Sequence, residues 1–293
     1  MSTSESDVSA VGDPAQAWEG AAARSGSLSP SRAGDFMTCP LLYRFRTIDR
    51  IPEKPSRVAV RGTVVHQVLE DLFDLPADQR TLEQAASMLP AAWDAVQRED
   101  EAAASQLFAT PEEADEWLAS AVPLLETYFR LEDPSRLEPA ERELRVETTL
   151  DDGLVLRGYV DRLDRNAAGE TRVVDYKTGK APGEGYEQKA LFQMRFYALV
   201  LWRATGTLPR LLQLLYLGNE QILRYEPDEA DLLATERKIK ALWRAIVQAQ
   251  ETGQWRPNPS KLCDWCDHHA ICPAFGGTPP PLPTLPVPAV PTA

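Results

Sequence analysis

Residues 173–179, with the sequence Val-Val-Asp-Tyr-Lys-Thr-Gly, constrain the fold more than any other part of this 293-residue chain. They predict an apolar strand that ends in Asp175 and Lys177, two positions apart. Side chains alternate between the two faces of a strand, so both groups should project to the same side. There they could hold a divalent cation and stabilise an oxyanion. On an exposed strand the same pattern is an ordinary surface ion pair.

A second acid stands in the preceding strand segment, in the run Gly158-Tyr159-Val160-Asp161-Arg162. A turn at Gly169 would let the two strands pair as neighbours in an antiparallel arrangement. In that pairing Asp161 and Asp175 should converge at one end of the sheet. Two carboxylates and a lysine are the composition of a hydrolytic metal site.

Helical residues could complete such a site. His66 lies on a predicted helix and offers a nitrogen ligand, although a histidine on an apolar helix face is usually a core residue. Gln193 and Tyr197 stand four residues apart, on one face of a later helix. Tyr197 can be explained by core packing, whereas a buried amide at Gln193 needs partners. Oxygen ligands favour Mg²⁺ or Mn²⁺, and a nitrogen ligand favours Mn²⁺ of the two.

The chain has four cysteines, which are Cys39, Cys263, Cys266 and Cys272. No signal peptide is recognisable, so we expect a cytoplasmic protein in which thiols stay reduced. The spacing then indicates a metal or cluster site, either tetrahedral zinc or an iron–sulfur cluster. Proline follows Cys39 and Cys272, which favours the cluster. His268 and His269 leave a Cys3His zinc site open.

Charge is distributed unevenly along the chain. The net charge is −13, and residues 99–152 hold 16 acids against 4 arginines. Residues 43–62 form a basic stripe that could bind a phosphate backbone or be an ordinary solvated surface. No apolar run is long enough for a transmembrane helix. We expect disordered tails at residues 1–26 and 276–293, and one domain at 27–275 with an acidic helical insertion at about 80–140.

Periodicity and cap residues predict the elements between the tails. Helices are expected at residues 30–46, 63–73, 82–98, 111–131, 188–204 and 229–251. Strands are expected at 144–150, 154–164, 172–177, 211–217 and 222–225, the first three as an antiparallel meander. This order predicts a mixed α/β fold with a central sheet, not a doubly wound Rossmann fold.

Six motifs in this order resemble the RecB-like branch of the PD-(D/E)XK nucleases, and the iron–sulfur members most closely. They are Leu28-Ser29-Pro30-Ser31 with Cys39-Pro40 and Tyr43, Gly62-Thr63-Val64-Val65-His66, Gly158-Tyr159-Val160-Asp161-Arg162, Asp175-Tyr176-Lys177-Thr178-Gly179, Gln193-Met194-Arg195-Phe196-Tyr197, and the three clustered cysteines. Members of this branch include the AddB nuclease domain and the CRISPR adaptation exonucleases. The resemblance spans residues 28–275 and implies a restriction-endonuclease-like core.

The resemblance also implies roles for single residues. His66, Asp161, Asp175 and the Tyr176 carbonyl oxygen would bind the catalytic metal. Lys177 would orient or activate the attacking water and stabilise negative charge. Gln193 and Tyr197 would support the site and the DNA strand. The family's [4Fe–4S] cluster would join Cys39 to the three C-terminal cysteines and clasp the two ends of the domain. The acidic residues 99–152 would then face away from the substrate or gate it.

The expected activity is a metal-dependent exonuclease acting on single-stranded DNA or duplex ends, in repair, recombination or defence. The chain has no GxxxxGK[ST] phosphate loop, so a helicase or repair-complex partner would be a separate protein. One alternative is a non-catalytic DNA-binding protein that retains a nuclease fold. Another is a zinc-clasped hydrolase acting on a different phosphodiester.

Overall fold

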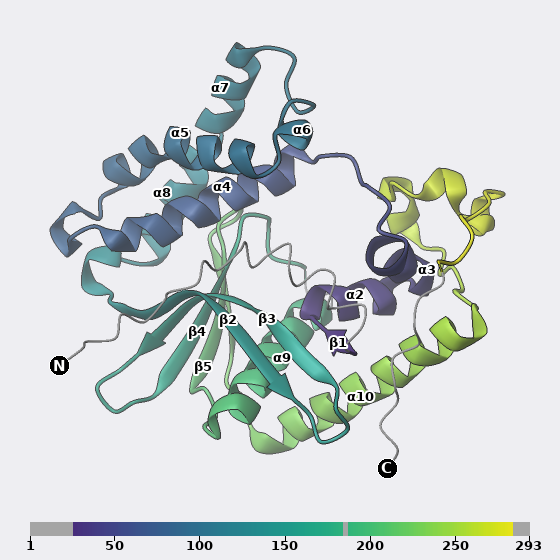
Figure 1. The fold of residues 1–293 in the computed structure, drawn as a ribbon. Coiled ribbons are helices and arrows are strands. Elements are labelled where there is room, and N and C mark those ends of the chain that lie inside the picture. The colour runs from purple at the N-terminus through teal and green to yellow at the C-terminus, as the bar shows by residue number, and fades with distance from the viewer. Residues whose placement is uncertain (1–25, 184–186, 284–293) are drawn as a thin grey trace, which may run out of the picture.

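The computed structural model describes residues 26–183 and 187–283 (Figure 1). The tails expected at 1–26 and 276–293 lie mostly outside the described residues. The described chain continues past Gly276, and the Pro280 carbonyl accepts a hydrogen bond from the Arg44 guanidinium. Within the described ranges, no helix combines the length and apolar character needed to cross a membrane.

A six-stranded mixed sheet forms the centre of the molecule. The strands are β1 (Ser27–Leu28), β2 (Pro139–Thr149), β3 (Val155–Arg165), β4 (Thr171–Lys177), β5 (Leu211–Tyr216) and β6 (Gln221–Tyr225). The order is β1-β3-β4-β5-β6, and β2 pairs with β3 outside this path. β2, β3 and β4 form the expected antiparallel meander, and β4 and β5 are parallel. The mixed α/β prediction is therefore confirmed.

The long strand β3 is paired unevenly along its two edges. β2 covers one edge over nearly its whole length. On the other edge β1 pairs with Val155 and Leu156, and β4 pairs with Arg162–Arg165. Residues 157–161 lie between these two partners, and no described strand pairs with them on that edge. This gap leaves room for a functional site at the middle of the sheet.

Helices cover both faces of the sheet (Figure 1). They are α2 (Pro30–Thr38), α3 (Pro40–Tyr43), α4 (Arg57–Asp71), α5 (Leu82–Glu99), α6 (Glu101–Ala104), α7 (Pro111–Ala119), α8 (Val122–Leu131), α9 (Gln188–Thr205) and α10 (Glu229–Thr252). One core lies on the α2, α9 and α10 side and contains Val173. A second core lies on the α4, α5, α7 and α8 side and contains Val174 and Tyr176. Successive β4 residues thus point into different cores, as strand alternation requires.

Three predicted helices have different bounds in the structure. The first ends at Cys39, whose backbone is extended (φ −161°, ψ 116°), because a residue before proline is disfavoured in the helical region. The second begins at Arg57 and is capped by Ser56, earlier than the predicted start at residue 63. The segment at 111–131 divides into α7 and α8, with Pro123 in the first turn of α8.

Candidate active site

β3 and β4 separate just before the two predicted acids. Their last described pair on this side joins Arg162 to Val174, and the same register would set Asp161 opposite Asp175. The strands part instead, and the Tyr176 backbone N–H donates to Asp161 Oδ2 at 2.7 Å. The predicted approach of the two strands therefore exists, and the carboxylates flank the fork between them.

His66, Glu143 and Asp161 form a three-ligand group at this fork. Each offers one ligand atom, and these three atoms lie within 4.8 Å of one another. His66 Nδ1 stands 3.5 Å from Asp161 Oδ2. The three side chains come from α4, β2 and β3, so the group exists only in the folded protein. One imidazole and two carboxylates are a suitable donor set for a divalent cation such as Mn²⁺.

Asp175 lies beside this group and is held on both of its oxygens. Lys177 Nζ stands 2.5 Å from Oδ2, and the Gln193 side-chain amide donates to Oδ1 at 3.0 Å. Tyr197 packs next to them over Gly158, where a Cβ would come within 2.7 Å of the tyrosine ring. His66, Asp161, Asp175, Lys177, Gln193 and Tyr197 all line one groove. Tyr176 contributes its backbone here, while its side chain is buried in the second core.

Glu143 was missed by the sequence analysis. The predicted strand began one residue later, and Glu143 was counted with the acidic segment expected to face away from the substrate or gate it. Its neighbours Arg142 and Leu144 pair with Arg162 and Val160, so Glu143 stands across from Asp161. Its φ is +42°, a strained backbone angle for a residue with a side chain. An acid placed across from another acid by the strand register was the signal that could have identified it.

Burial and the closeness of several acids shift the pKa values of the residues at the fork. Burial, followed by the nearby Asp175 carboxylate, raises the pKa of Asp161. Burial, followed by Asp161, raises the pKa of Glu143 to about 7. Burial also lowers the pKa of His66 and favours the neutral imidazole that binds metals. A bound cation would lower the raised pKa values of Asp161 and Glu143, because it compensates clustered negative charge, and it would stabilise the neutral form of His66.

Lys177 keeps its proton in this setting. Burial alone lowers the pKa of Lys177, but the ion pair with Asp175 outweighs it, and the net shift is upward. The side chain is therefore an ammonium group at neutral pH. It can orient a water molecule and stabilise negative charge, but it has no free lone pair with which to take a proton.

The groove above the acids has a volume of about 660 Å³ and cationic walls. Its lining includes Arg46, Arg145, Arg157 and Lys189, as well as Tyr159, whose side chain is 41% exposed. A second hollow of about 610 Å³ opens beside it and shares His66 and Lys177. The hollow is also lined by two acids, Glu70 and Glu143, which make it more negative than the groove. The candidate metal group thus lies between a basic groove and an acidic hollow.

The basic stripe predicted at residues 43–62 is largely neutralised by neighbouring acids. Arg44 is buried and pairs with Asp49 at 2.9 Å. Arg46 pairs with Glu53 at 2.7 Å, and Arg57 pairs with Glu113. Of these partners, only Glu113 lies outside the stripe, 56 residues from Arg57, where sequence spacing could not reveal it. The strands and α9 add Arg145, Arg157 and Lys189 to the groove, of which Arg145 pairs with Glu147 at 2.7 Å, Arg157 is buried and Lys189 is exposed.

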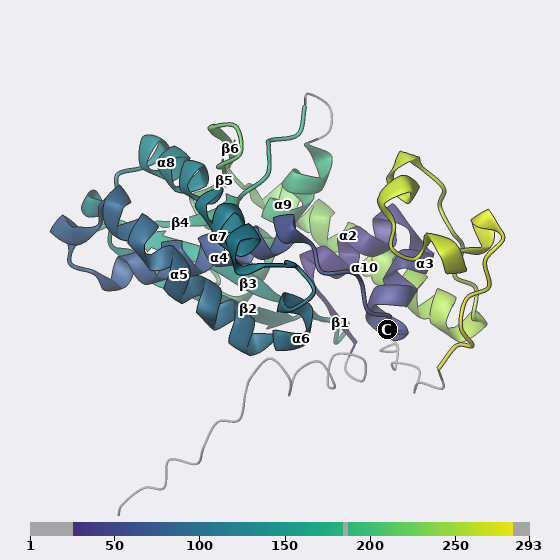
Figure 2. The ribbon, with the colours of Figure 1, turned by 90° about the horizontal axis from the view of Figure 1, so that it is seen from above.

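The four cysteines line one small cavity of about 60 Å³. Cys39 stands at the break between α2 and α3, and the other three lie in the short turns at residues 261–275. Both ribbon views show this C-terminal segment, in yellow, beside α3 (Figures 1 and 2). Backbone N–H groups of Asn258 and Ser260 donate to the sulfurs of Cys39 and Cys263 at 3.4 and 3.3 Å. The fold thus brings together thiols that are more than 200 residues apart.

The cysteine cavity is lined by four thiols and two histidines. A single zinc with bonds of about 2.3 Å holds its thiolates about 4 Å apart. Among the described residues, no three cysteine or histidine ligand atoms lie within 4.8 Å of one another at this cavity. His268 pairs with Glu53 at 3.0 Å, and His269 stacks on Phe275. The four thiols around one cavity, with N–H donors to two of them, form a shared donor set of the kind that holds a zinc ion or an iron–sulfur cluster.

Comparison with known proteins places the chain in a family. The Gene 69 protein of Mycobacterium phage D29 is 26% identical over 281 residues, which cover 84% of this chain and 96% of that protein. The Gene 69 protein of Mycobacterium phage L5 is 29% identical over 127 residues, or 42% of this chain and 41% of that protein. The crystal structure of a proposed exonuclease from Eubacterium rectale shares the fold, with 14% identity, a TM-score of 0.57 and coverage of 87% and 91%.

The family match extends over nearly all of the described chain. It covers residues 27–273 and includes the fork, the groove and the four cysteines. This protein belongs to the PD-(D/E)XK nuclease superfamily.

Proposed function

We propose that this nuclease is a metal-dependent deoxyribonuclease and that it works as an exonuclease on single-stranded DNA or duplex ends. One observation carries the proposal: His66, Glu143 and Asp161 lie within 4.8 Å of one another beside the Asp175–Lys177 pair. His66, Asp161 and the Asp175–Lys177 pair line a groove of about 660 Å³ whose walls carry cations, and Glu143 lines the adjoining hollow. The E. rectale protein of the same fold is named as an exonuclease, which agrees with the proposal.

The metal would be Mg²⁺ or Mn²⁺, held by His66, Asp161, Glu143 and Asp175. When bound, such an ion polarises a phosphodiester and supplies a nucleophilic water at neutral pH. The Tyr176 N–H fixes one oxygen of Asp161, and the Gln193 amide fixes one oxygen of Asp175. These contacts orient the carboxylates before any ligand arrives, so little reorganisation remains for the reaction.

Lys177 is the cation that the protein itself brings to the reaction. Its ammonium group stands against Asp175, at the edge shared by the groove and the acidic hollow. Negative charge grows on the phosphate oxygens as the water attacks, and a buried ammonium group stabilises it more strongly than solvent would. Lys177 therefore orients the water and stabilises charge.

The groove would hold the DNA backbone on Arg145, Arg157 and Lys189. Burial, together with the adjacent Arg32, lowers the pKa of Arg157, which reflects cations gathered at one place. An anionic backbone relieves this repulsion. Tyr159 projects into the same groove and offers an aromatic face for a base. Bases are accessible for such stacking in single strands and frayed ends.

The four thiols would hold a [4Fe–4S] cluster, as in the RecB-like iron–sulfur branch. Their shared cavity supports a common site, and the proline after Cys39 and after Cys272 favours the cluster over a zinc ion. Purification without oxygen should yield a brown protein with equal iron and sulfide, and His269→Ala should leave both contents unchanged. A colourless protein with one zinc per chain would contradict the cluster and favour the zinc alternative.

Digestion of end-labelled DNA tests the nuclease assignment directly. Single- and double-stranded substrates labelled at either the 5′ or the 3′ end are incubated with Mg²⁺ or Mn²⁺. The wild-type protein should release labelled products from an end, and Asp175→Ala and Lys177→Ala should lose this activity. Glu226→Gln is the matched control, because Glu226 is exposed and pairs with Arg210 outside the groove.

The same assay separates the alternatives. Undiminished digestion by both site variants would remove the assignment. DNA binding without metal-dependent cleavage by the wild-type protein would identify a non-catalytic DNA-binding protein instead. End-specific release would fit a role in DNA repair, recombination or defence, alone or beside a separate helicase. Internal cleavage would show an endonuclease.

A further inference from the structure

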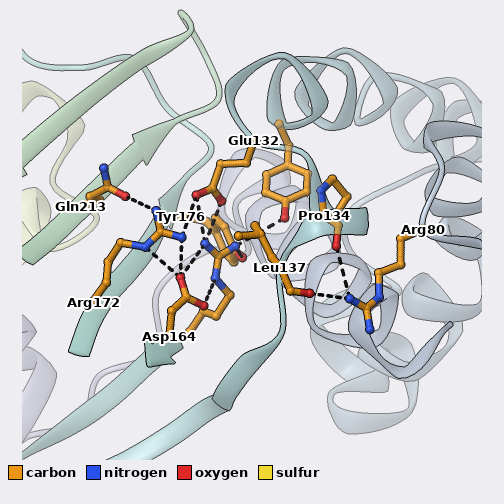
Figure 3. Close-up of polar contacts among 10 residues, drawn as sticks. Arg80, Glu132, Pro134, Leu137, Asp164, Arg172, Tyr176 and Gln213 are labelled. Atoms are coloured by element: carbon orange, nitrogen blue, oxygen red, sulfur yellow. Dashed lines mark hydrogen bonds and ion pairs between the residues drawn. The ribbon is translucent and has the colours of Figure 1, made fainter. Parts of the chain in front are cut away.

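Arg162 is a fully buried cation at the centre of a polar network on the second face of the sheet. Its guanidinium donates to Asp164 at 3.0 Å, to Glu132 at 2.8 Å and to the Tyr176 hydroxyl at 2.8 Å. Figure 3 shows Glu132, Asp164, Arg172 and Tyr176 gathered in one cluster. Both acids also pair with Arg172, so the cluster holds two cations and two anions.

Stability alone is a weak reason for such a cluster. Removing ions from water is costly, and a well-packed apolar substitute is often as stable as a buried ion pair. A buried network with all its members bonded does, however, hold each of them in one geometry. Tyr176 is a member of this network and also contacts the residues at the fork, so the network fixes its position there.

Tyr176 connects the network to the metal group through three different parts of the residue. Its hydroxyl accepts the hydrogen bond from Arg162. Its ring packs edge-on against the His66 ring, with centroids 5.9 Å apart and planes at 87°. Its backbone N–H donates to Asp161. Tyr176 therefore contacts two of the groups that would bind the cation, His66 and Asp161.

The helical insertion fixes the other side of the network. Glu132 immediately follows α8 and receives two contacts from Arg162. Tyr128, on α8 itself, receives another at 3.4 Å and packs edge-on against the Tyr176 ring. The insertion thus reaches β3 and β4 at the residues that neighbour Asp161 and Asp175 in sequence.

We propose that Arg162 is a positioning residue for the metal site and acts through Tyr176. By holding the hydroxyl, it fixes the ring that supports His66 and the N–H that holds Asp161. Glu132, at the α8 end of the insertion, helps to hold Arg162 in this position. The proposal rests on the proposed function in one respect, because it takes the His66 group as the place where the cation binds.

The test measures Mn²⁺ binding to the full chain by titration calorimetry. Tyr176→Phe removes the hydroxyl but keeps the ring and the backbone N–H, so it breaks only the connection to Arg162. Gln213→Met is the matched control, because Gln213 receives a bond from Arg172 at the outer end of the same network. Both variants should lower the unfolding midpoint. Only Tyr176→Phe should weaken Mn²⁺ binding, by about tenfold, as loss of support around metal ligands does.

A variant of Arg162 itself is a poor first test, because it would leave two buried acids without their cation and could prevent folding. Equal Mn²⁺ affinity in wild type and Tyr176→Phe, with a lowered midpoint in the variant, would show that the network only stabilises the fold and would overturn the proposal. If Gln213→Met weakened Mn²⁺ binding as much as Tyr176→Phe, the proposal would also be overturned, because any disturbance of the network would then weaken binding. Failure of the wild type to bind Mn²⁺ would refute the proposed function as well.

Discussion

At the fork between β3 and β4 the ligand groups stand on long strands and a long helix, with packed cores on both faces of the sheet. Around the cysteine cavity, three of the four thiols stand on short turns beside exposed residues such as Leu262 and Trp265, the latter 78% exposed. The fork is therefore shaped by the fold before any ion binds. The cysteine segment has little core of its own and depends on what the thiols hold. We therefore expect substitutions at the fork to affect mainly catalysis and substitutions in the cysteine region to affect mainly stability.

Breaking the cysteine region should give the largest effect on stability. Cys39→Ser removes the single thiol that links the start of the domain to its end. The proposed clasp would close a loop of more than 200 residues, and losing such a link should cost about 5 kcal/mol of unfolding free energy. Chemical denaturation under anaerobic conditions measures it. An unchanged midpoint would show that the thiols do not hold a clasp.

Breaking the fork should affect the rate more than stability, which falls only because the buried Asp175 carboxylate loses its ion-pair partner. Lys177→Met removes the ammonium group and keeps most of the chain length. We expect kcat to fall by about 10²- to 10³-fold, because a buried charge that stabilises the reacting phosphate is lost. Single-turnover cleavage of labelled DNA measures the rate. A fall in stability as large as that of Cys39→Ser would contradict the division of labour between the two regions.

The pH dependence of stability should report the crowded acids at the fork. The folded pKa of Glu143, about 7, lies above the value of 4.5 for an ordinary glutamate. Its contribution is therefore fully present below about pH 4.5 and is lost as the pH rises through 7. With a chelator present to remove metal ions, the unfolding free energy of Glu143→Gln should exceed that of the wild type by about 1–2 kcal/mol at pH 8, after allowance for solvent screening. At pH 4.5 the two proteins should have the same unfolding free energy.

Thermal unfolding at the two pH values measures the difference. Glu147→Gln, at an exposed acid of the same strand, should give no such gain. Added Mn²⁺ should reverse the order of wild type and Glu143→Gln at pH 8, because the cation favours the ionised carboxylate. A gain that is equal at both pH values would contradict the assignment of the effect to Glu143 ionisation.

The smallest effect should come from the walls of the groove. Lys189→Ala removes one exposed cation, which should raise KM for DNA about fivefold and reduce the salt slope of binding by about 1. Arg210→Ala removes an equally accessible cation outside the groove and should change neither quantity. Fluorescence anisotropy with labelled DNA over a range of salt concentrations measures both. Equal slopes for the two variants would place the DNA elsewhere.

Local patterns in the sequence predicted most of the elements and part of the site. A two-residue period sets Asp175 and Lys177 on the same side of a strand whatever the strand packs against. A single turn at Gly169 was enough to pair β3 with β4 and bring Asp161 close to Asp175. The cysteine spacing indicated a shared site. These features depend on short stretches of chain, which is why sequence reasoning can reach them.

The tertiary structure decided the rest, because it depends on contacts between distant segments. Glu143 faces the site only through its register with β3 and its unusual φ angle. In the stripe at residues 43–62, Arg46 also pairs with Asp35 and Arg57 pairs with Glu113, acids that lie outside the stripe. Arg162 becomes a positioning candidate only because α8 brings Glu132 and Tyr128 to it. A sequence specifies the period of each element, whereas packing determines which elements meet, and the candidate group of His66, Glu143 and Asp161 forms where three elements meet.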